Sequence, residues 1–80
     1  MDYGAHTPRQ LGQTLRGQRK SQKITQKDAA KTVGLLPKTV SKLELATETA
    51  TIESLFKLLS ALQLELVVRT RSPDAQAREW

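Results

Sequence analysis

Apolar side chains recur three or four residues apart in four successive segments of the 80-residue chain, with polar and charged residues between them. This spacing places the apolar positions on one face of an α-helix. The period therefore predicts four amphipathic helices packed around one core, and the last and most apolar helix should form its centre. The expected inward positions are Leu11 and Leu15; Ala29, Ala30 and Val33; Val40 and Leu43; and Ile52, Leu55, Phe56, Leu59 and Leu62.

The predicted helix starts carry residues that favour helix initiation. Thr7, Thr25 and Thr51 each precede a helical segment, and a threonine hydroxyl can accept a hydrogen bond from a free N–H group of the first turn. Pro37 also suits a first helical position, because its missing N–H would have no partner there. Leu36, the residue before it, is an atypical cap, so this start is the least well defined.

The period changes from helical to alternating in residues 64–70. Leu64 and Leu66 lie two apart, and the β-branched Val67 and Val68 follow. This pattern predicts a strand. Because a lone strand would leave an apolar edge unpaired, we expect it to pair with the same strand of a second copy across a two-fold axis. The alternative interpretation is that the fourth helix continues through this segment.

Residues 25–43 contain two short predicted helices joined by one tight turn. Gly34 lies at the turn, where a left-handed backbone is easiest without a Cβ atom. Ala30 lies where the two helices should cross most closely. This is the layout of a helix-turn-helix, whose second helix is sized for the DNA major groove.

The charge is distributed unevenly along the chain. The net charge is +5, and residues 1–42 hold nine Lys/Arg against two Asp/Glu, whereas residues 43–80 hold four against six. The basic excess of +7 therefore belongs to the half that carries the helix-turn-helix. A basic surface of this kind is expected to face phosphate groups.

The second helix of this unit supplies the candidate base contacts. Its outward residues near the N-terminal end are Pro37, Lys38 and Thr39, with Lys42 one turn further on. Lys38 can donate to guanine O6 and N7, and the Thr39 methyl group can contact a thymine methyl group. Pro37 offers only shape or apolar contact. Lys42 is either a phosphate contact or a solvated residue.

Three other residues are candidates for contacts to the DNA backbone. Gln26, at the start of the preceding helix, can place its amide and the free N–H groups of that helix against a phosphate. Ser41 is expected to contact phosphate rather than a base. Arg19 can contact phosphate, pair with Glu44, or do both, because a guanidinium has five N–H donors.

The chain offers no constellation for catalysis. It has no cysteine and one histidine, His6, so no thiol nucleophile, metal cluster or Ser-His-acid set can be assembled. We therefore expect no enzyme activity, no metal and no cofactor. The absence of cysteine fits a reducing cytoplasm, and no apolar run approaches the length of a membrane span. At this length the core is small, so a dimer would add stability.

From about Leu11 to Leu62 the chain resembles the Xre/lambda-repressor-like helix-turn-helix domains. The resemblance implies that Thr25 and Gln26 contact backbone phosphate, that the helix from Pro37 reads bases, and that Arg19 pairs with Glu44. The sequence departs from the family where Leu-Ala-Thr follows Glu44 and where Pro37 replaces a polar reader. The residues that carry the resemblance are Arg19, Thr25, Gln26, Ala30, Gly34, Val40, Ser41, Glu44 and the run from Ile52 to Leu59.

A narrower resemblance covers nearly the whole chain. The run Thr-Val-Ser-Lys-Leu-Glu, the apolar fourth helix, a terminal strand, a polar tail and a final Glu79-Trp80 resemble HipB-type antitoxins. The resemblance implies a homodimer that pairs its C-terminal strands, represses its own operon and binds a HipA-type serine/threonine kinase toxin. Trp80 is then a candidate anchor for a pocket on that partner.

These observations predict an all-α domain of four or five helices with a C-terminal strand that pairs across a homodimer. Its expected function is repression at a roughly palindromic double-stranded DNA operator, as an antitoxin. The alternatives are a stand-alone phage-type repressor and, because of Pro37, a protein-binding inhibitor with little DNA readout. The expected segments are a disordered N-terminus (1–6), the helix-turn-helix domain (7–63), the dimerisation strand (64–70) and a flexible tail (71–80). The dimerisation residues would be Leu64, Leu66, Val67 and Val68.

Overall fold

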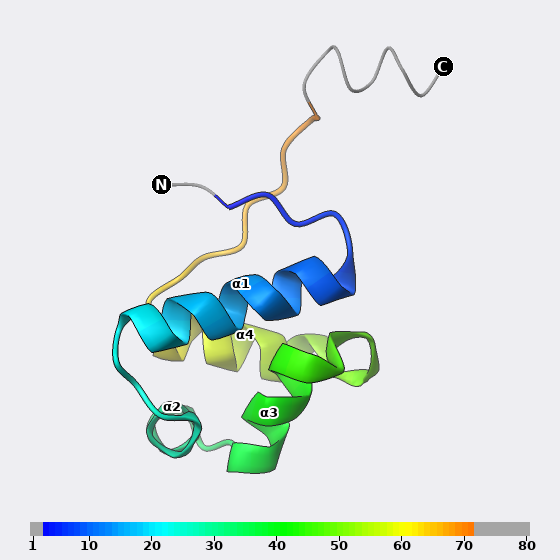
Figure 1. Ribbon diagram of the computed structural model, residues 1–80. Coiled ribbons are helices and arrows are strands. Elements are labelled where there is room, and N and C mark those ends of the chain that lie inside the picture. Colours follow the sequence, from blue (N-terminus) through cyan, green and yellow to red (C-terminus); the bar gives the residue numbers. More distant parts are fainter. Residues whose placement is uncertain (1–2, 72–80) are drawn as a thin grey trace.

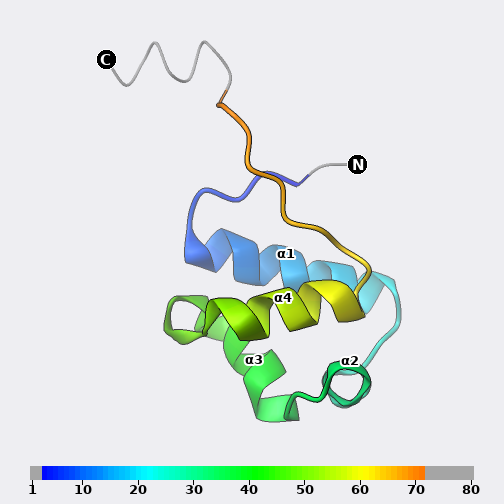
Figure 2. The same ribbon diagram turned by 180° about the vertical axis from the view of Figure 1, so that it is seen from behind.

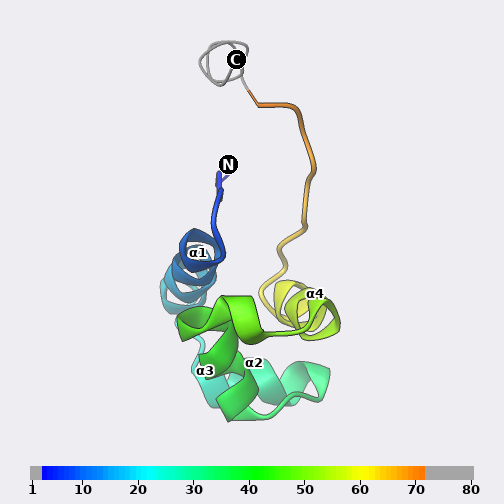
Figure 3. The ribbon, with the colours of Figure 1, turned by 90° about the vertical axis from the view of Figure 1, so that its right-hand side faces the viewer.

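Helices α1 and α4 form an upper layer that lies across α2 and α3 (Figures 1 and 2). This computed structural model describes residues 3–71. Seen from the side, α1 and α4 occupy opposite sides of the upper layer (Figure 3). The elements are α1 (Pro8–Ser21), α2 (Gln26–Val33), α3 (Pro37–Leu45), the short 3₁₀ helix η1 (Thr47–Thr49) and α4 (Ile52–Ala61).

The expected threonine caps begin three of the four α-helices in the described residues. Each threonine hydroxyl accepts a hydrogen bond from the N–H group three residues later, which satisfies one free donor of the first turn. Helix α3 begins after Leu36 without a side-chain cap, with Pro37 in its first turn. The predicted starts are therefore confirmed. The bonds join Thr7 Oγ1 to the Gln10 N–H (3.1 Å), Thr25 Oγ1 to the Asp28 N–H (3.0 Å) and Thr51 Oγ1 to the Ser54 N–H (3.1 Å).

The core lies between the two layers, and the inward face of α4 differs from the prediction. Leu58 is fully buried, whereas Ile52 is 68% and Phe56 50% exposed. Placing Ile52 and Phe56 in the core was therefore wrong, because α4 is apolar on more than one face and its spacing alone does not select the buried one. Val33 is half-buried rather than fully inward. The buried core consists of Leu15, Ala29, Ala30, Val40, Leu43, Leu55, Leu58, Leu59 and Leu62.

Helix α4 ends at Ala61, and two residues later Gln63 has a left-handed backbone with a φ of 57°. The Leu64 N–H then donates to the Leu59 carbonyl at 2.8 Å, which closes the last turn in the manner of a Schellman motif. The alternative that the helix continues through residues 64–70 is therefore wrong. Those residues run away from the helices (Figure 1). They form no strand within this single chain, and the expected pairing requires a second copy, so it stays a prediction.

A close approach between α1 and the end of α3 depends on Gly12. This glycine is buried, and a Cβ atom on it would lie 2.5 Å from the Glu44 carbonyl oxygen and even closer to the Thr47 hydroxyl. A side chain at this position would therefore push α1 away from α3. The hydrophobic pattern gives no sign of this contact, because glycine adds nothing to an apolar stripe.

Candidate nucleic-acid interface

Helices α2 and α3 meet at the predicted turn. Gly34 follows α2 with a φ of 72°, and the Leu35 N–H donates to the Ala30 carbonyl at 2.8 Å. Ala30 is 1% exposed at the packed side of α2. The left-handed glycine reverses the chain within a few residues, so α3 packs across α2 as the sequence predicts.

The predicted reading residues occupy the outer side of α3. Val40 and Leu43 are fully buried and hold α3 against the core. Pro37, Lys38 and Lys42 are exposed, whereas Thr39 and Ser41 are half-buried. Helix α3 therefore presents two lysines and a proline to solvent, with two short hydroxyl side chains beside them. This side of α3, at residues 37–39, 41 and 42, is called the reading face below.

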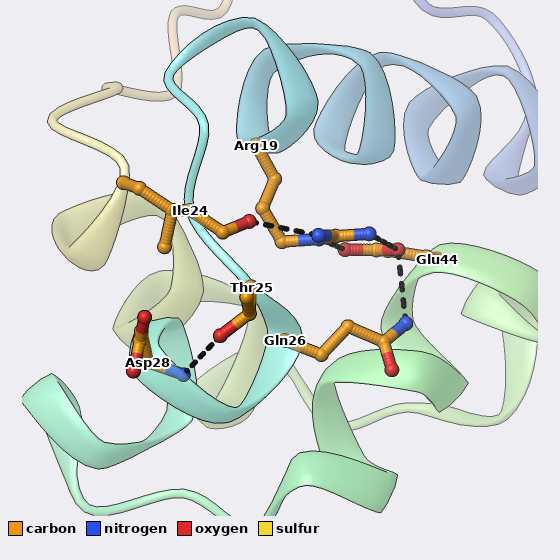
Figure 4. A network of polar contacts seen from close by, with 6 residues as sticks. All are labelled: Arg19, Ile24, Thr25, Gln26, Asp28 and Glu44. Carbon is orange, nitrogen blue, oxygen red and sulfur yellow. Dashed lines mark hydrogen bonds and ion pairs between the residues drawn. The ribbon is translucent and has the colours of Figure 1, made fainter.

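A buried ion pair ties α1 to the base of α3 (Figure 4). Arg19 Nε lies 2.6 Å from Glu44 Oε2, and Arg19 Nη2 lies 3.2 Å from Glu44 Oε1. Arg19 Nη1 donates to the Ile24 carbonyl at 2.8 Å. Arg19 is 8% and Glu44 4% exposed. The two-point guanidinium–carboxylate geometry fixes both side chains, so the predicted pairing is confirmed and contact of Arg19 with phosphate stays a prediction.

Gln26 extends this network to the start of α2. Its Nε2 donates to Glu44 Oε1 at 3.2 Å, so Glu44 accepts from both Arg19 and Gln26 (Figure 4). This contact fixes the direction of the half-buried amide and leaves its second N–H available. The sequence reasoning missed this bond, because it considered Gln26 only as a phosphate contact and Glu44 only as the partner of Arg19.

Thr25 lies beside Gln26 and is exposed. Its hydroxyl oxygen accepts from the Asp28 N–H, which leaves the hydroxyl hydrogen free to donate. The start of α2 thus presents a hydroxyl donor, an amide donor and free backbone N–H groups. Such a set suits an anion.

A second surface of the molecule is apolar and lies at the start of α4. Ile52 and Leu66 line a hollow of about 380 Å³ together with residues of α1. Of the predicted dimerisation residues, Leu64 packs against the core, whereas Leu66, Val67 and Val68 are 49%, 61% and 93% exposed. Trp80 lies outside the described residues.

Two other kinds of feature, a metal-binding cluster and a membrane-spanning helix, can be assessed in the residues that the structure describes. Over residues 3–71, His, Cys, Asp and Glu side chains form no group of three or more that could hold a metal ion. Within the same part of the chain, no helix has the length and apolar character needed to cross a membrane.

Two short helices that cross at a buried alanine, with the second helix exposed along its outer side, define a helix-turn-helix DNA-binding domain. A family model described as "Helix-turn-helix" matches residues 15–68. The chain belongs to this helix-turn-helix family. A comparison with curated protein sequences finds no match.

Solved structures of HipB resemble nearly the whole chain. The structure described as "HipB(S29A)-O2 20mer complex" has a TM-score of 0.85 and 25% identity, and covers 90% of this chain and 100% of that chain. "Structure of HipA-HipB-O2-O3 complex" gives 0.85 and 25%, covering 89% and 100%. "HipB-O1-O2 complex" gives 0.82 and 26%, covering 86% and 100%. The expected HipB-type resemblance is therefore confirmed.

Proposed function

We propose that this protein is a homodimeric, sequence-specific transcriptional repressor and the antitoxin of a HipA-type kinase toxin. The DNA-binding part rests on one observation: the exposed reading face of α3 lies beside the start of α2, whose free donors suit an anion. A hydrogen bond from Gln26 of α2 to Glu44 of α3 joins the two helices. A major-groove helix flanked by phosphate contacts is the standard docking geometry of this motif.

In this proposal Lys38 and Thr39 contact base edges. Lys38 is exposed in the first turn of α3, and its ammonium group can donate to guanine O6 and N7. Thr39 places a methyl group near the same turn, suited to a thymine methyl group. Pro37 supplies shape alone. Ser41 and Lys42 lie further along α3, where they contact phosphate.

The start of α2 contacts the DNA backbone. The free hydroxyl hydrogen of Thr25 and the second amide N–H of Gln26 point to one phosphate group. Arg19 contributes through Glu44, because its ion pair holds the carboxylate that orients Gln26. These contacts fix the position of the protein on the duplex without distinguishing sequences.

The dimer forms through the apolar surface. Ile52, Phe56, Leu66, Val67 and Val68 are large exposed apolar residues of the described chain, and a second copy would cover them. Residues 64–70 of the two copies would pair as antiparallel strands. A two-fold dimer predicts a roughly palindromic operator with half-sites about one helical turn apart, or a small multiple of a turn.

The toxin partner is inferred from a structural likeness. Its support is the likeness to a structure described as "Structure of HipA-HipB-O2-O3 complex", which covers 100% of that chain. Trp80 is the proposed anchor for the toxin. The competing functions are a stand-alone repressor and a protein-binding inhibitor, and Pro37 is the residue that favours the latter because it cannot hydrogen-bond to a base.

Fluorescence anisotropy tests operator recognition. Labelled DNA from immediately upstream of the gene is compared with a scrambled duplex near physiological salt, and a preference of ~10³-fold or more is expected. Lys38→Ala should lower cognate affinity by ~1–3 kcal/mol and relax one base position. Lys57→Ala, on α4 beside Glu53, is the matched control. Equal affinity for both duplexes would refute sequence-specific recognition and leave the inhibitor as the better proposal.

A further inference from the structure

The outer side of α1 carries a row of basic and polar residues that the proposed function does not use. Arg9, Gln13 and Arg16 are spaced four and three residues apart, which places them on one face of the helix. All three are exposed. Together with Glu44 and Leu45 of α3 and Glu48 of η1, they line a hollow of about 530 Å³, called the outer hollow below.

The outer hollow adjoins the proposed phosphate site at the start of α2. Glu44 lines this hollow, and its carboxylate, on a side chain that is 0% exposed, accepts the hydrogen bond of Gln26. Leu45, the last residue of α3, is 71% exposed on its wall. Figure 3 shows α4 on the other side of the upper layer from α1. A duplex that extends from Gln26 along the outer side of α3 to its last residue would therefore reach this hollow.

The charges around the outer hollow favour an anion. Neither Arg9 nor Arg16 takes part in the ion pairs found among residues 3–71, so their guanidinium groups are unpaired within that part of the chain. Glu44 is neutralised by Arg19. Glu48 is the remaining negative charge on the wall, which leaves two positive charges against one.

A second copy of the chain is a poorer occupant of this hollow. Of the large exposed apolar residues of α4 and of the following segment, Ile52 and Leu66 line the other hollow, beside residues of α1. The outer hollow presents guanidinium groups and one exposed leucine, which an apolar interface would desolvate at a cost. Its charge complements a polyanion.

We propose that Arg9 and Arg16 bind the sugar–phosphate backbone of DNA next to the phosphate held by Gln26. This inference rests on the proposed function and adds α1 to the DNA interface. The seven helical steps from Arg9 to Arg16 rise about 10 Å along α1, which is comparable to the rise of about three base pairs along the axis of a DNA duplex. Two guanidinium groups on one helix face can therefore contact separate phosphates of the same strand.

The salt dependence of DNA binding tests this proposal. Each phosphate contact contributes about 0.9 to the slope of log affinity against log salt on double-stranded DNA. On an operator bound by two protomers, the double variant Arg9→Gln/Arg16→Gln removes four phosphate contacts and should lower that slope by about 3.6, so its loss of affinity between 50 and 200 mM salt is about 150-fold smaller than that of the unmodified protein. The duplex must extend several base pairs beyond the half-site, so that the flanking phosphates are present.

Three further variants make the measurement specific. Arg9→Lys/Arg16→Lys keeps both charges and should retain the slope. Glu48→Gln removes the negative charge of the outer hollow and should raise affinity. Lys57→Gln removes a cation on α4, beside Glu53, and should change neither the salt slope nor the DNA affinity. Far-UV circular dichroism of each variant confirms that the helices are retained.

The outcomes separate this proposal from the proposed function. An unchanged slope for the glutamine double variant overturns the α1 contact, even if the operator is still preferred over scrambled DNA. An equal loss in the lysine double variant also overturns it, because charge would then not be the cause. A lowered slope on both duplexes, without any sequence preference, supports the α1 contact while refuting operator recognition.

Discussion

Neutralising Glu44 should strongly destabilise this domain, because its carboxylate is the counter-charge of a buried guanidinium. The Glu44 carboxylate accepts from Arg19 Nε at 2.6 Å, from Arg19 Nη2 at 3.2 Å and from Gln26 Nε2 at 3.2 Å. Glu44 is 4% exposed and Arg19 8%. In a Glu44→Gln variant the guanidinium would stay buried without a counter-charge, and the carboxamide could not accept all three bonds.

The expected loss of unfolding free energy follows from the burial of Arg19 and Glu44. Removing one partner of a buried ion pair destabilises a protein by about 3–5 kcal/mol. A domain of this length is stable by about 4–12 kcal/mol in total, so the variant should lose a large share of its stability. Because 1 kcal/mol shifts the melting temperature of such a domain by about 4–8 °C, we expect a decrease of at least about 12 °C.

Urea denaturation followed by far-UV circular dichroism measures the free energy of unfolding. The protein concentration must be the same for each variant, because dimerisation makes stability concentration-dependent. The matched control is Glu53→Gln, whose carboxylate is 82% exposed and 3.9 Å from Lys57 Nζ. Its expected effect is below about 1 kcal/mol. If Glu44→Gln lost no more than this control, the ion pair would not be desolvated and the reasoning would be refuted.

A double replacement separates stability from DNA binding. In Arg19→Met/Glu44→Leu both charges are absent, and apolar side chains of similar size can leave stability unchanged or raise it. Gln26 then has no acceptor at position 44. We expect a folded protein with weaker DNA affinity, measured by anisotropy. A folded double variant with full affinity would show that the orientation of Gln26 does not depend on Glu44.

Two other predictions concern packing and assembly. Gly12→Ala should destabilise the domain by about 1–3 kcal/mol, because its Cβ atom would lie 2.5 Å from the Glu44 carbonyl oxygen. The control is Gly17→Ala on the same helix, where an added Cβ atom would have nothing within 4 Å. This variant should stabilise the domain by up to about 1 kcal/mol in the same urea titration. Phe56→Ser should weaken the proposed dimer roughly thirtyfold, since half of each Phe56 side chain is exposed in the single chain and burying it in both copies contributes about 2 kcal/mol. Analytical ultracentrifugation showing an unchanged dimer would place Phe56 outside the interface.

The helix boundaries could be predicted because their causes are local. A threonine cap and a left-handed glycine act within a few residues, so Thr7, Thr51 and Gly34 indicate the starts and the turn without knowledge of the fold. The buried face of α4 could not be predicted in the same way. Leu58 and Phe56 both fit a helical spacing, and only packing against α2 and α3 decides that Leu58 is buried and Phe56 exposed.

The candidate site shows the same division. The outward positions of Lys38 and Lys42 follow from the inward positions of Val40 and Leu43, and the structure confirms them. The bond from Gln26 to Glu44 joins residues eighteen positions apart, and no local pattern contains it. Gly12 is a further example, because its role depends on a carbonyl group of another helix.

The network around Glu44 also determines which residue can distinguish DNA sequences. Pro37 has no hydrogen-bond donor, and Gln26 has one amide N–H engaged by Glu44 at 3.2 Å. In the proposed complex, hydrogen-bonded base readout in the first turn of α3 is assigned to Lys38, with apolar contact from the Thr39 methyl group beside it. A single flexible ammonium group gives limited discrimination between bases. Much of the operator preference should then come from the shape and deformability of the DNA between the two half-sites of a dimer. A sequence preference that survives Lys38→Ala but disappears when the central base pairs are changed would show that DNA shape contributes more to specificity than the Lys38 contact.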